Sequence, residues 1–280
     1  MIQRHISHPG PQSQPRVISQ PCSARRLSIR FQPGKSVLEA VAEALGAAGV
    51  DSAVIEFDAG KLRPLVYVIP APSADEAFAA WYSDIRRPDG TARFERVVMS
   101  YGRRGEAPFI HCHGIWRHAD GFRGAGHLIP HETVFAEEVE ATVYALSGAI
   151  LDQQPDPETN FPLLTPVPNG VAREGGHRAV LVRAKPNTDI HAALEEVASR
   201  HGIRNASIHG IGSLVGCDFV DGRQMVSYAS ELFIREGRID SGEATIDIGV
   251  VGIDAEIFEG EILRGGNVIC IACELLIVEA

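Results

Sequence analysis

Three histidines near the middle of the chain have the spacing of a metal site. His111 and His113 stand two positions apart in the segment 108–116, which reads as a β-strand. Side chains two positions apart on a strand leave the same face, so these two imidazoles would lie side by side. The turn residues in 120–124 then predict a hairpin whose returning strand brings His127 to that face.

Three imidazoles that converge from adjacent strands suit zinc or a similar divalent ion and leave one coordination position open. An open position is typical of a catalytic site, where the ion polarises a carbonyl group or lowers the pKa of bound water. Glu95 and Glu132 are candidate bases because they lie near the histidines in the sequence. His118 and His131 are either further ligands or ordinary surface histidines. The simpler interpretation of the whole pattern is a half-exposed strand that binds no metal.

The composition is that of a globular protein. The 280 residues, 45% of them hydrophobic and 22% charged, are enough for two domains of ordinary size. No apolar run is long enough for a membrane span, and the polar N-terminal sequence lacks the apolar stretch of a signal peptide, so we expect a cytoplasmic protein. The formal net charge of -10 argues against a surface that binds nucleic acid, since such binding depends on clustered lysine and arginine.

The five cysteines are odd in number and scattered, which indicates reduced thiols rather than a disulfide framework. Cys270 and Cys273 have the spacing of a redox motif. They lie in the apolar run 268–278, however, which reads as a buried strand, whereas a reactive pair needs a helix N-terminus to lower the thiol pKa. We therefore expect no redox function.

An internal repeat organises the chain. Residues 33–44 match residues 186–197, and each copy reads as a strand, a turn and an amphipathic helix. Ser36 followed by Glu39 is the pattern of a capping box at the start of the first helix, and Thr188 and Asp189 are the candidate caps of the second. Further short strands with glycine turns follow each helix.

The sequence therefore predicts an α+β fold of two units, each a mainly antiparallel sheet with one principal helix. The expected boundaries are a disordered tail at 1–21, a first unit with the histidines at 22–151, a linker at 152–176 and a second unit without them at 177–280. The linker is expected because its sequence is rich in Pro, Asp, Asn and Gly.

Three motifs resemble the plant and prokaryote conserved (PPC) domain, a module that follows AT-hooks in plant nuclear proteins and occurs alone in prokaryotes. They are the Gly-Ile-Gly-Ser run at 210–213, the strand at 94–102, and His111-x-His113 together with Gly126-His127-Leu128. Because these motifs span both units, the chain resembles a tandem pair of PPC domains. The resemblance implies a compact α+β domain that assembles as trimers and, in some prokaryotic members, binds a divalent metal through the histidine cluster. It implies no known reaction.

The second unit departs from this pattern, because it has Asp247 and Glu261 where the first unit has histidines. The lack of nitrogen ligands favours a lost site and an architectural role for this unit. The first unit has Phe-Asp-Ala-Gly at 57–60 in place of Gly-Ile-Gly-Ser, and His131 stands where the family more often has glycine. The AT-hook core Arg-Gly-Arg-Pro is missing, so direct DNA binding is the hypothesis that the sequence favours least.

Two hypotheses for function follow. The first is a PPC-like metalloprotein that binds zinc through His111, His113 and His127 and acts on a small-molecule substrate as a hydrolase or lyase. The alternative is a non-catalytic assembly or regulatory module. In both cases we expect a homotrimer, because a whole-chain trimer closes all interfaces with the fewest distinct contacts. We also expect the histidine site at a boundary between subunits or units, where a cleft can form.

Overall fold

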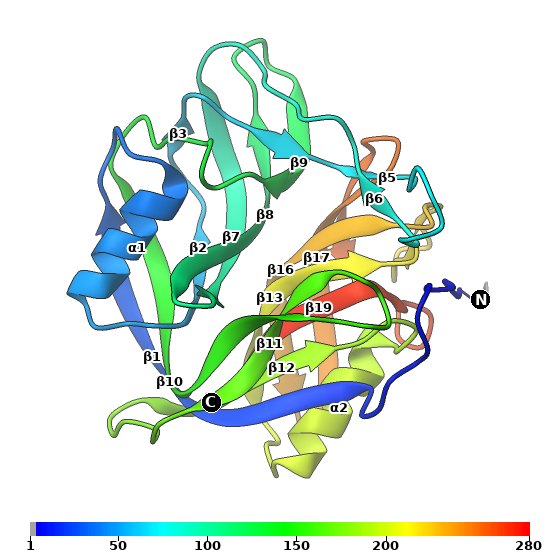
Figure 1. Cartoon of the computed structure of the whole chain (residues 1–280). Helices are drawn as coiled ribbons and strands as arrows, with labels where there is room; N and C mark the ends of the chain where they lie inside the picture. Colours follow the sequence, from blue (N-terminus) through cyan, green and yellow to red (C-terminus); the bar gives the residue numbers. More distant parts are fainter. Residues whose placement is uncertain (1–3) are drawn as a thin grey trace.

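The computed structural model describes residues 4–280. Its main feature is one large curled sheet of 15 strands, mainly antiparallel, accompanied by two helices (Figure 1). The mainly antiparallel strands and the two helices agree with the predicted fold class, but the strands form one continuous sheet instead of one sheet per unit.

The first half contains one helix and most of the short strands. Its elements are β1 (Val17–Phe31), α1 (Val37–Ala47), β2 (Ala53–Phe57), β3 (Lys61–Leu62), β4 (Tyr67–Val68), β5 (Pro70–Ala71), β6 (Trp81–Tyr82), β7 (Ala92–Arg104), β8 (Ala107–Arg117), β9 (Arg123–Leu128), β10 (Val139–Pro155) and β11 (Pro162–Asn169). The second half contains β12 (His177–Ala184), α2 (Ile190–Arg200), β13 (Ala206–Leu214), β14 (Cys217–Asp218), β15 (Gln224–Met225), β16 (Ser230–Asp240), β17 (Glu243–Gly252), β18 (Ile257–Glu261) and β19 (Ile269–Glu279).

The two halves have the same strand order. It is β1-β10-β2-β7-β8-β9 in the first half and β12-β19-β13-β16-β17-β18 in the second. In each half the helix follows the first strand, as the sequence repeat predicts. Antiparallel pairing of β1 with β12 joins the halves into one sheet.

Both helices begin at the residues that the sequence indicates. The side chain of Ser36 accepts a hydrogen bond from the backbone N–H of Glu39 at 3.2 Å, and the Glu39 carboxylate accepts one from the backbone N–H of Ser36 at 3.0 Å. Asp189 accepts from the backbone N–H of Ala192 at 3.0 Å at the start of α2. These contacts satisfy amide groups that the first turn leaves free.

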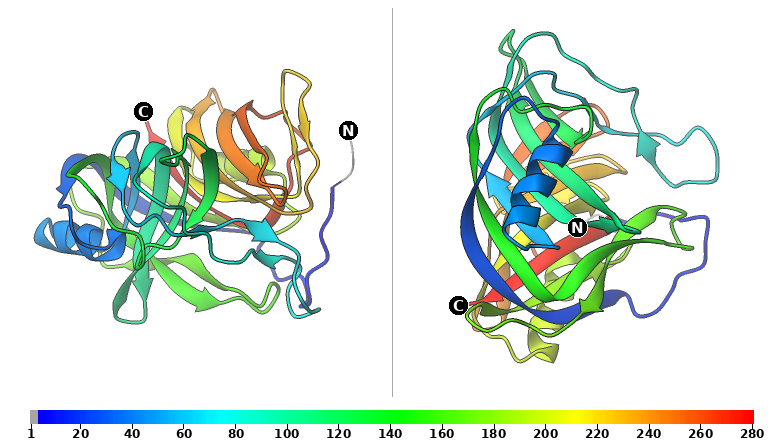
Figure 2. Two further views of the ribbon diagram at one scale, coloured as in Figure 1. Left: turned by 90° about the horizontal axis from the view of Figure 1, so that it is seen from above. Right: turned by 60° about the vertical axis from the view of Figure 1, so that its left-hand side comes forward.

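The curl of the sheet packs the two halves against each other. The apolar core under α1 continues into the second half as far as Phe233 and Leu276, whereas the core under α2 lies mostly within the second half. β16 contacts β8 and β9, and Figure 2 shows these segments from two further sides. The strand with the histidine pair therefore faces the second half rather than solvent.

The N-terminal segment differs from the expected disordered tail at 1–21. Residues 1–3 lie outside the described part of the chain, residues 4–16 pack along the second half, and β1 already begins at Val17. The segment is held by polar contacts with distant residues, including an ion pair of 2.7 Å between Arg4 and Asp218, both nearly buried. The polarity of the N-terminal sequence does not indicate contacts with residues so far away along the chain.

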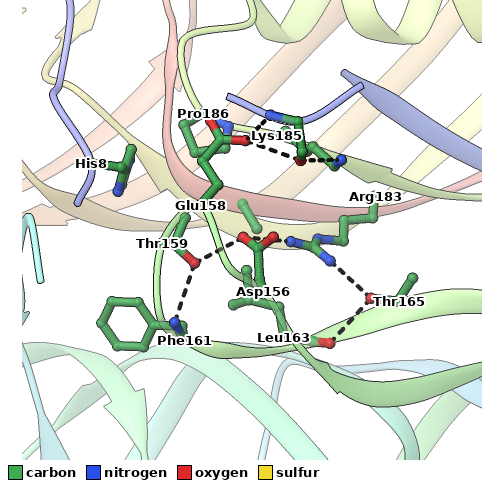
Figure 3. Close-up of polar contacts among 12 residues, drawn as sticks. His8, Asp156, Glu158, Thr159, Phe161, Leu163, Thr165, Arg183, Lys185 and Pro186 are labelled. Atoms are coloured by element: carbon green, nitrogen blue, oxygen red, sulfur yellow. Dashed lines mark hydrogen bonds and ion pairs between the residues drawn. The ribbon is translucent and has the colours of Figure 1, made fainter. Parts of the chain in front are cut away.

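The expected linker at 152–176 is instead a β-hairpin, because β10 continues to Pro155 and β11 returns along it. Leu163 and Leu164 of β11 are buried, so the segment contributes to the packed structure. Its turn contains a buried polar network, in which the Arg183 guanidinium lies between Asp156 and Thr165 (Figure 3). The proline and aspartate content marks this tight turn rather than a flexible connection.

Two further expectations concern the cysteines and the membrane. All five cysteines are free and buried, and burial raises the pKa of the Cys273 thiol to about 12. Cys270 and Cys273 lie in β19, in agreement with a structural role. Within residues 4–280, no helix has the length and apolar character needed to cross a membrane.

Candidate metal centre

The strand pairing brings His111, His113 and His127 together. β8 and β9 pair with His113 directly opposite His127, and His111 lies two positions earlier on the same face of β8. One ring nitrogen from each side chain can be chosen so that all three atoms lie within 4.8 Å of one another. The parity of the strand and the hairpin turn therefore predict the grouping correctly.

Two of these nitrogens are already close to the spacing of metal ligands. Nε2 of His111 and Nε2 of His113 are 3.0 Å apart. Two ligands of a tetrahedral zinc ion, each at about 2.0–2.1 Å from it, are separated by roughly 3.3 Å. The pair thus has nearly the geometry that a shared ion requires.

The other ring nitrogen of each of these histidines has a hydrogen-bond acceptor. Nδ1 of His113 lies 2.8 Å from the carbonyl oxygen of Leu232, and Nδ1 of His111 lies 3.0 Å from a carboxylate oxygen of Glu274. A neutral imidazole that donates from Nδ1 has only a lone pair at Nε2. In that tautomer the two lone pairs face each other at 3.0 Å, a repulsive contact that a cation between them would relieve.

The second half of the chain supplies two buried carboxylates to this site. Glu274 of β19 contacts His111, and an oxygen of Glu231 in β16 lies 4.0 Å from Nδ1 of His127. Within residues 4–280, Nδ1 of His127 and one oxygen of each glutamate are buried without a hydrogen-bond partner. Buried polar atoms rarely remain unpaired, so their convergence indicates a missing polar ligand or ion.

The protonation of the histidines suits metal binding. Burial, together with the neighbouring imidazoles, holds the pKa of His113 well below its usual value. The pKa of His127 is also held well below its usual value, by burial and by the neighbouring His111 imidazole. Both side chains are therefore neutral at pH 7, which is the form that binds zinc.

The three imidazoles line a cavity of about 870 Å³ between the two halves. Its polar lining includes Glu231, Glu274 and Ser213, while Trp81, Tyr82 and Phe161 contribute aromatic surface. The size lies in the range of small-molecule sites. The position agrees with the expectation of a cleft at a boundary between units.

The structure does not bring Glu95 and Glu132 to the imidazoles. Glu95 pairs with Arg117 at 2.7 Å and with Arg123 at 2.6 Å, and Glu132 pairs with Arg87. Neither glutamate lines the cavity. Nearness in the sequence misleads here, because both side chains form ion pairs elsewhere on the surface.

The other two histidines near the cluster also lie outside the three-imidazole group. His118 contacts the hydroxyl of Tyr67 at 3.3 Å, and the exposed His131 lies in the cavity lining. Neither belongs to the group of residues that can share an ion.

Sequence reasoning missed Glu231 and Glu274. A signal for Glu274 exists in the sequence, because it is the one carboxylate in the otherwise apolar run 268–278. A lone charge in a buried strand needs a partner, which is a reason to expect a functional or paired group there. No local pattern indicates that its partner is His111, 163 positions away.

The second half has no equivalent histidine site. Asp247 and Glu261 occupy opposed positions on β17 and β18, as His113 and His127 do on β8 and β9. Asp247 pairs with Arg235 at 3.3 Å. Within residues 4–280, His111, His113 and His127 are the group of side chains whose geometry could hold an ion.

The sequence of the second half is similar to a known family. Residues 172–280 match the Plants and Prokaryotes Conserved (PCC) domain, the family written PPC above. The match includes the Gly-Ile-Gly-Ser run at 210–213 and excludes His111, His113 and His127. No curated protein matches the chain in sequence.

Solved structures with a similar fold include two archaeal proteins. A metal-containing protein from Archaeoglobus fulgidus has 20% identity and a TM-score of 0.42, over 51% of this chain and 94% of its own. A PPC protein from Pyrococcus horikoshii has 18% identity and a TM-score of 0.42, over 54% of this chain and 96% of its own. Likenesses at this level carry no argument about the chemistry of the site.

Proposed function

We propose that this protein binds one divalent metal ion, zinc, through His111, His113 and His127. The observation that carries the proposal is the 3.0 Å separation of two Nε2 atoms whose rings already have acceptors at Nδ1. A carboxylate or carbonyl behind a metal-bound histidine fixes its tautomer and orientation. The site therefore has both its ligands and the groups that orient them.

The first and second halves form this site together, and we propose that both are PPC-like units related by duplication. Their identical strand order supports this interpretation of the first half, which lies outside the family match. The histidines come from one unit, and Glu231, Leu232 and Glu274 come from the other. The second unit thus supports the site although it lacks histidines at the equivalent positions.

For catalysis we propose a hydrolase or lyase reaction on a small molecule in the cavity. A bound zinc ion would supply a Lewis acid and lower the pKa of a bound water. Glu231 lines the cavity with an oxygen 4.0 Å from Nδ1 of His127, and it is the carboxyl group placed to exchange a proton with a bound water or substrate. Glu274 orients His111. Glu231 thus replaces Glu95 and Glu132 as the acid–base candidate.

A titration of the metal-free protein with Co²⁺ tests the site, because cobalt replaces zinc and reports tetrahedral nitrogen coordination by its visible absorption. We expect one ion per chain. His127→Ala should weaken binding at least a hundredfold, and Glu274→Gln about 10- to 100-fold. His131→Ala is the matched control and should bind as the wild type does. Unchanged binding by His127→Ala would refute the proposal.

Activity separates the catalytic proposal from the alternative of an assembly or regulatory module. The zinc-loaded protein is assayed against panels of esters, amides, lactones and hydroxy acids, with Glu231→Gln as the comparison. Turnover that falls in Glu231→Gln while zinc content is kept supports catalysis. Metal binding without turnover on any of these classes would favour the non-catalytic alternative.

A further inference from the structure

Three aromatic side chains, Trp81, Tyr82 and Phe161, form an aromatic wall of the cavity, and Phe78 packs against them without lining it. The rings of Trp81 and Phe161 are stacked, with centroids 5.3 Å apart and planes 23° apart. Phe78 packs against both, at 4.3 Å from Trp81 and 4.8 Å from Phe161. Tyr82 extends the wall to the metal centre, where its ring lies 5.2 Å from that of His127.

This wall runs from the histidines to solvent. Tyr82 lies at its inner end and Trp81 at its outer end, and both line the cavity. Trp81 is 41% exposed although it is a large apolar residue in a well-packed cluster. An exposed indole in the mouth of a cavity is a surface that a ligand can cover.

The structure holds this wall in place before any ligand binds. The backbone N–H of Phe161 donates to the Thr159 hydroxyl at 3.3 Å, and that hydroxyl donates to Asp156 at 2.9 Å. Asp156 in turn forms an ion pair of 2.9 Å with Arg183, and both are nearly fully buried (Figure 3). A preformed apolar surface reduces the cost of ordering on binding.

Apolar residues such as Ile110 and Ile271 also line the cavity, and Ile271 packs against the same cluster as Phe161. The unpaired polar atoms of the cavity, on His127, Glu231 and Glu274, are concentrated at the inner end. A ligand that contacts both the polar inner end and the aromatic wall has a polar, metal-binding group at one end and a flat apolar body at the other.

We infer that the cavity binds a small molecule with an aromatic body and an oxygen group that coordinates the metal. This inference rests on the proposed metal site and specifies the class of substrate that the site takes. The volume of about 870 Å³ is enough for one or two rings beside the metal centre. The rings of the ligand lie against the aromatic wall, and its oxygen group points to the histidines.

Hydroxamates test this inference without knowledge of the reaction. Acetohydroxamate, cyclohexanecarbohydroxamate and benzohydroxamate share the metal-binding group and differ in the body attached to it. Their dissociation constants are measured on the Co²⁺-loaded protein from the change in cobalt absorption. Quenching of Trp81 fluorescence gives a second readout, and Trp81→Phe isolates the contribution of Trp116, which is fully buried.

We expect benzohydroxamate to bind at least about tenfold more tightly than acetohydroxamate, because it buries its ring against the wall. Trp81→Ala and Phe161→Leu should remove most of that gain while leaving acetohydroxamate affinity unchanged. Trp81→Ala changes an exposed side chain and leaves the buried core intact. Phe122→Ala, which removes an exposed aromatic residue that does not line the cavity, is the control and should behave as the wild type.

Each outcome has a separate meaning. If acetohydroxamate binds and benzohydroxamate binds no more tightly, the inference is wrong while the metal site stands. An equal gain for the cyclohexane compound would overturn the aromatic specificity, because it shows that the cavity selects apolar bulk alone. If neither cobalt nor acetohydroxamate binds, the proposed function itself fails.

Discussion

At the scale of single residues, the two nitrogens of each imidazole on β8 have different roles. Nδ1 of His111 and of His113 faces an acceptor from the second half, and Nε2 faces the centre of the site. His127 is less constrained, because its Nδ1 has no hydrogen-bond partner and Glu231 lies 4.0 Å away. The site thus combines two fixed ligands with a third that can adjust when an ion binds.

The depressed pKa values of His113 and His127 predict how pH affects the metal-free protein. Below about pH 6.5 the unfolded chain binds protons at these histidines and the folded chain does not, so the free energy of unfolding falls as the pH falls. The loss is about 1.4 kcal/mol per pH unit for each histidine until the folded side chain itself is protonated. Urea denaturation between pH 7 and pH 5 measures this loss in the free energy of unfolding.

Glu231 acts in the opposite direction. Burial raises its pKa well above the ordinary value, so the folded chain keeps a proton that the unfolded chain releases above about pH 4.5, and acid favours the folded state. The pH dependence of the free energy of unfolding is therefore compared in two variants. One carries Glu231→Gln alone, and the other carries Glu231→Gln together with His113→Asn and His127→Asn. A pH dependence that these two substitutions leave unchanged would show that the histidines do not cause it.

At the scale of elements, the backbone of β9 positions His127. Gly126 has a φ of +151°, and a Cβ there would lie 2.2 Å from the carbonyl oxygen of Val68. Val68 lies in β4, which pairs with β9 directly beside His127. The close approach of β4 therefore requires glycine at this position and sets the direction of the next side chain.

Gly126→Ala should weaken Co²⁺ binding at least about tenfold, because the added methyl group pushes β9 away from β4 and displaces His127. The control is Gly46→Ala in α1, where a Cβ meets no atom within 4 Å. That substitution should leave metal affinity unchanged and stabilise the helix by about 0.5–1 kcal/mol. Equal metal affinities in the two variants would contradict the positioning role of Gly126.

The same elements show what the sequence can predict. The strand alternation at His111 and His113, the turn before His127 and the capping box at Ser36 are local patterns, and the structure confirms them. The contacts of Glu274 with His111 and of Glu158 with Arg16 join residues more than 140 positions apart. Such contacts depend on how the sheet curls, which no local pattern encodes, so the ordered N-terminal segment and the acid–base residues could not be predicted.

At the scale of the whole molecule, the two halves are arranged so that β8 and β9 of one face β16 of the other. The proposed metal centre therefore lies between the two halves of a single chain. His209 of β13 also contacts Glu56 of β2, at 2.8 Å, which is a second polar link between the halves. Separating the halves would remove Glu231, Leu232 and Glu274 from the imidazoles.

The expected homotrimer remains a prediction at this scale. Closed symmetry is the usual outcome for soluble homo-oligomers, and a trimer of the whole chain needs the fewest distinct interfaces. Light scattering at micromolar concentration should give the mass of three chains of 30.2 kDa. A monomer mass would contradict this assembly, and a dimer would favour rings that mix both kinds of unit.

The most direct test of the central claim is a crystal structure of the zinc-loaded protein, with anomalous diffraction recorded on both sides of the zinc absorption edge. We predict one strong anomalous peak per chain, about 2.0–2.1 Å from Nε2 of His111, Nε2 of His113 and one ring nitrogen of His127. The peak should face the cavity between the two halves. A zinc-loaded crystal with no peak among these histidines, or with its ordered zinc bound elsewhere, would contradict the account.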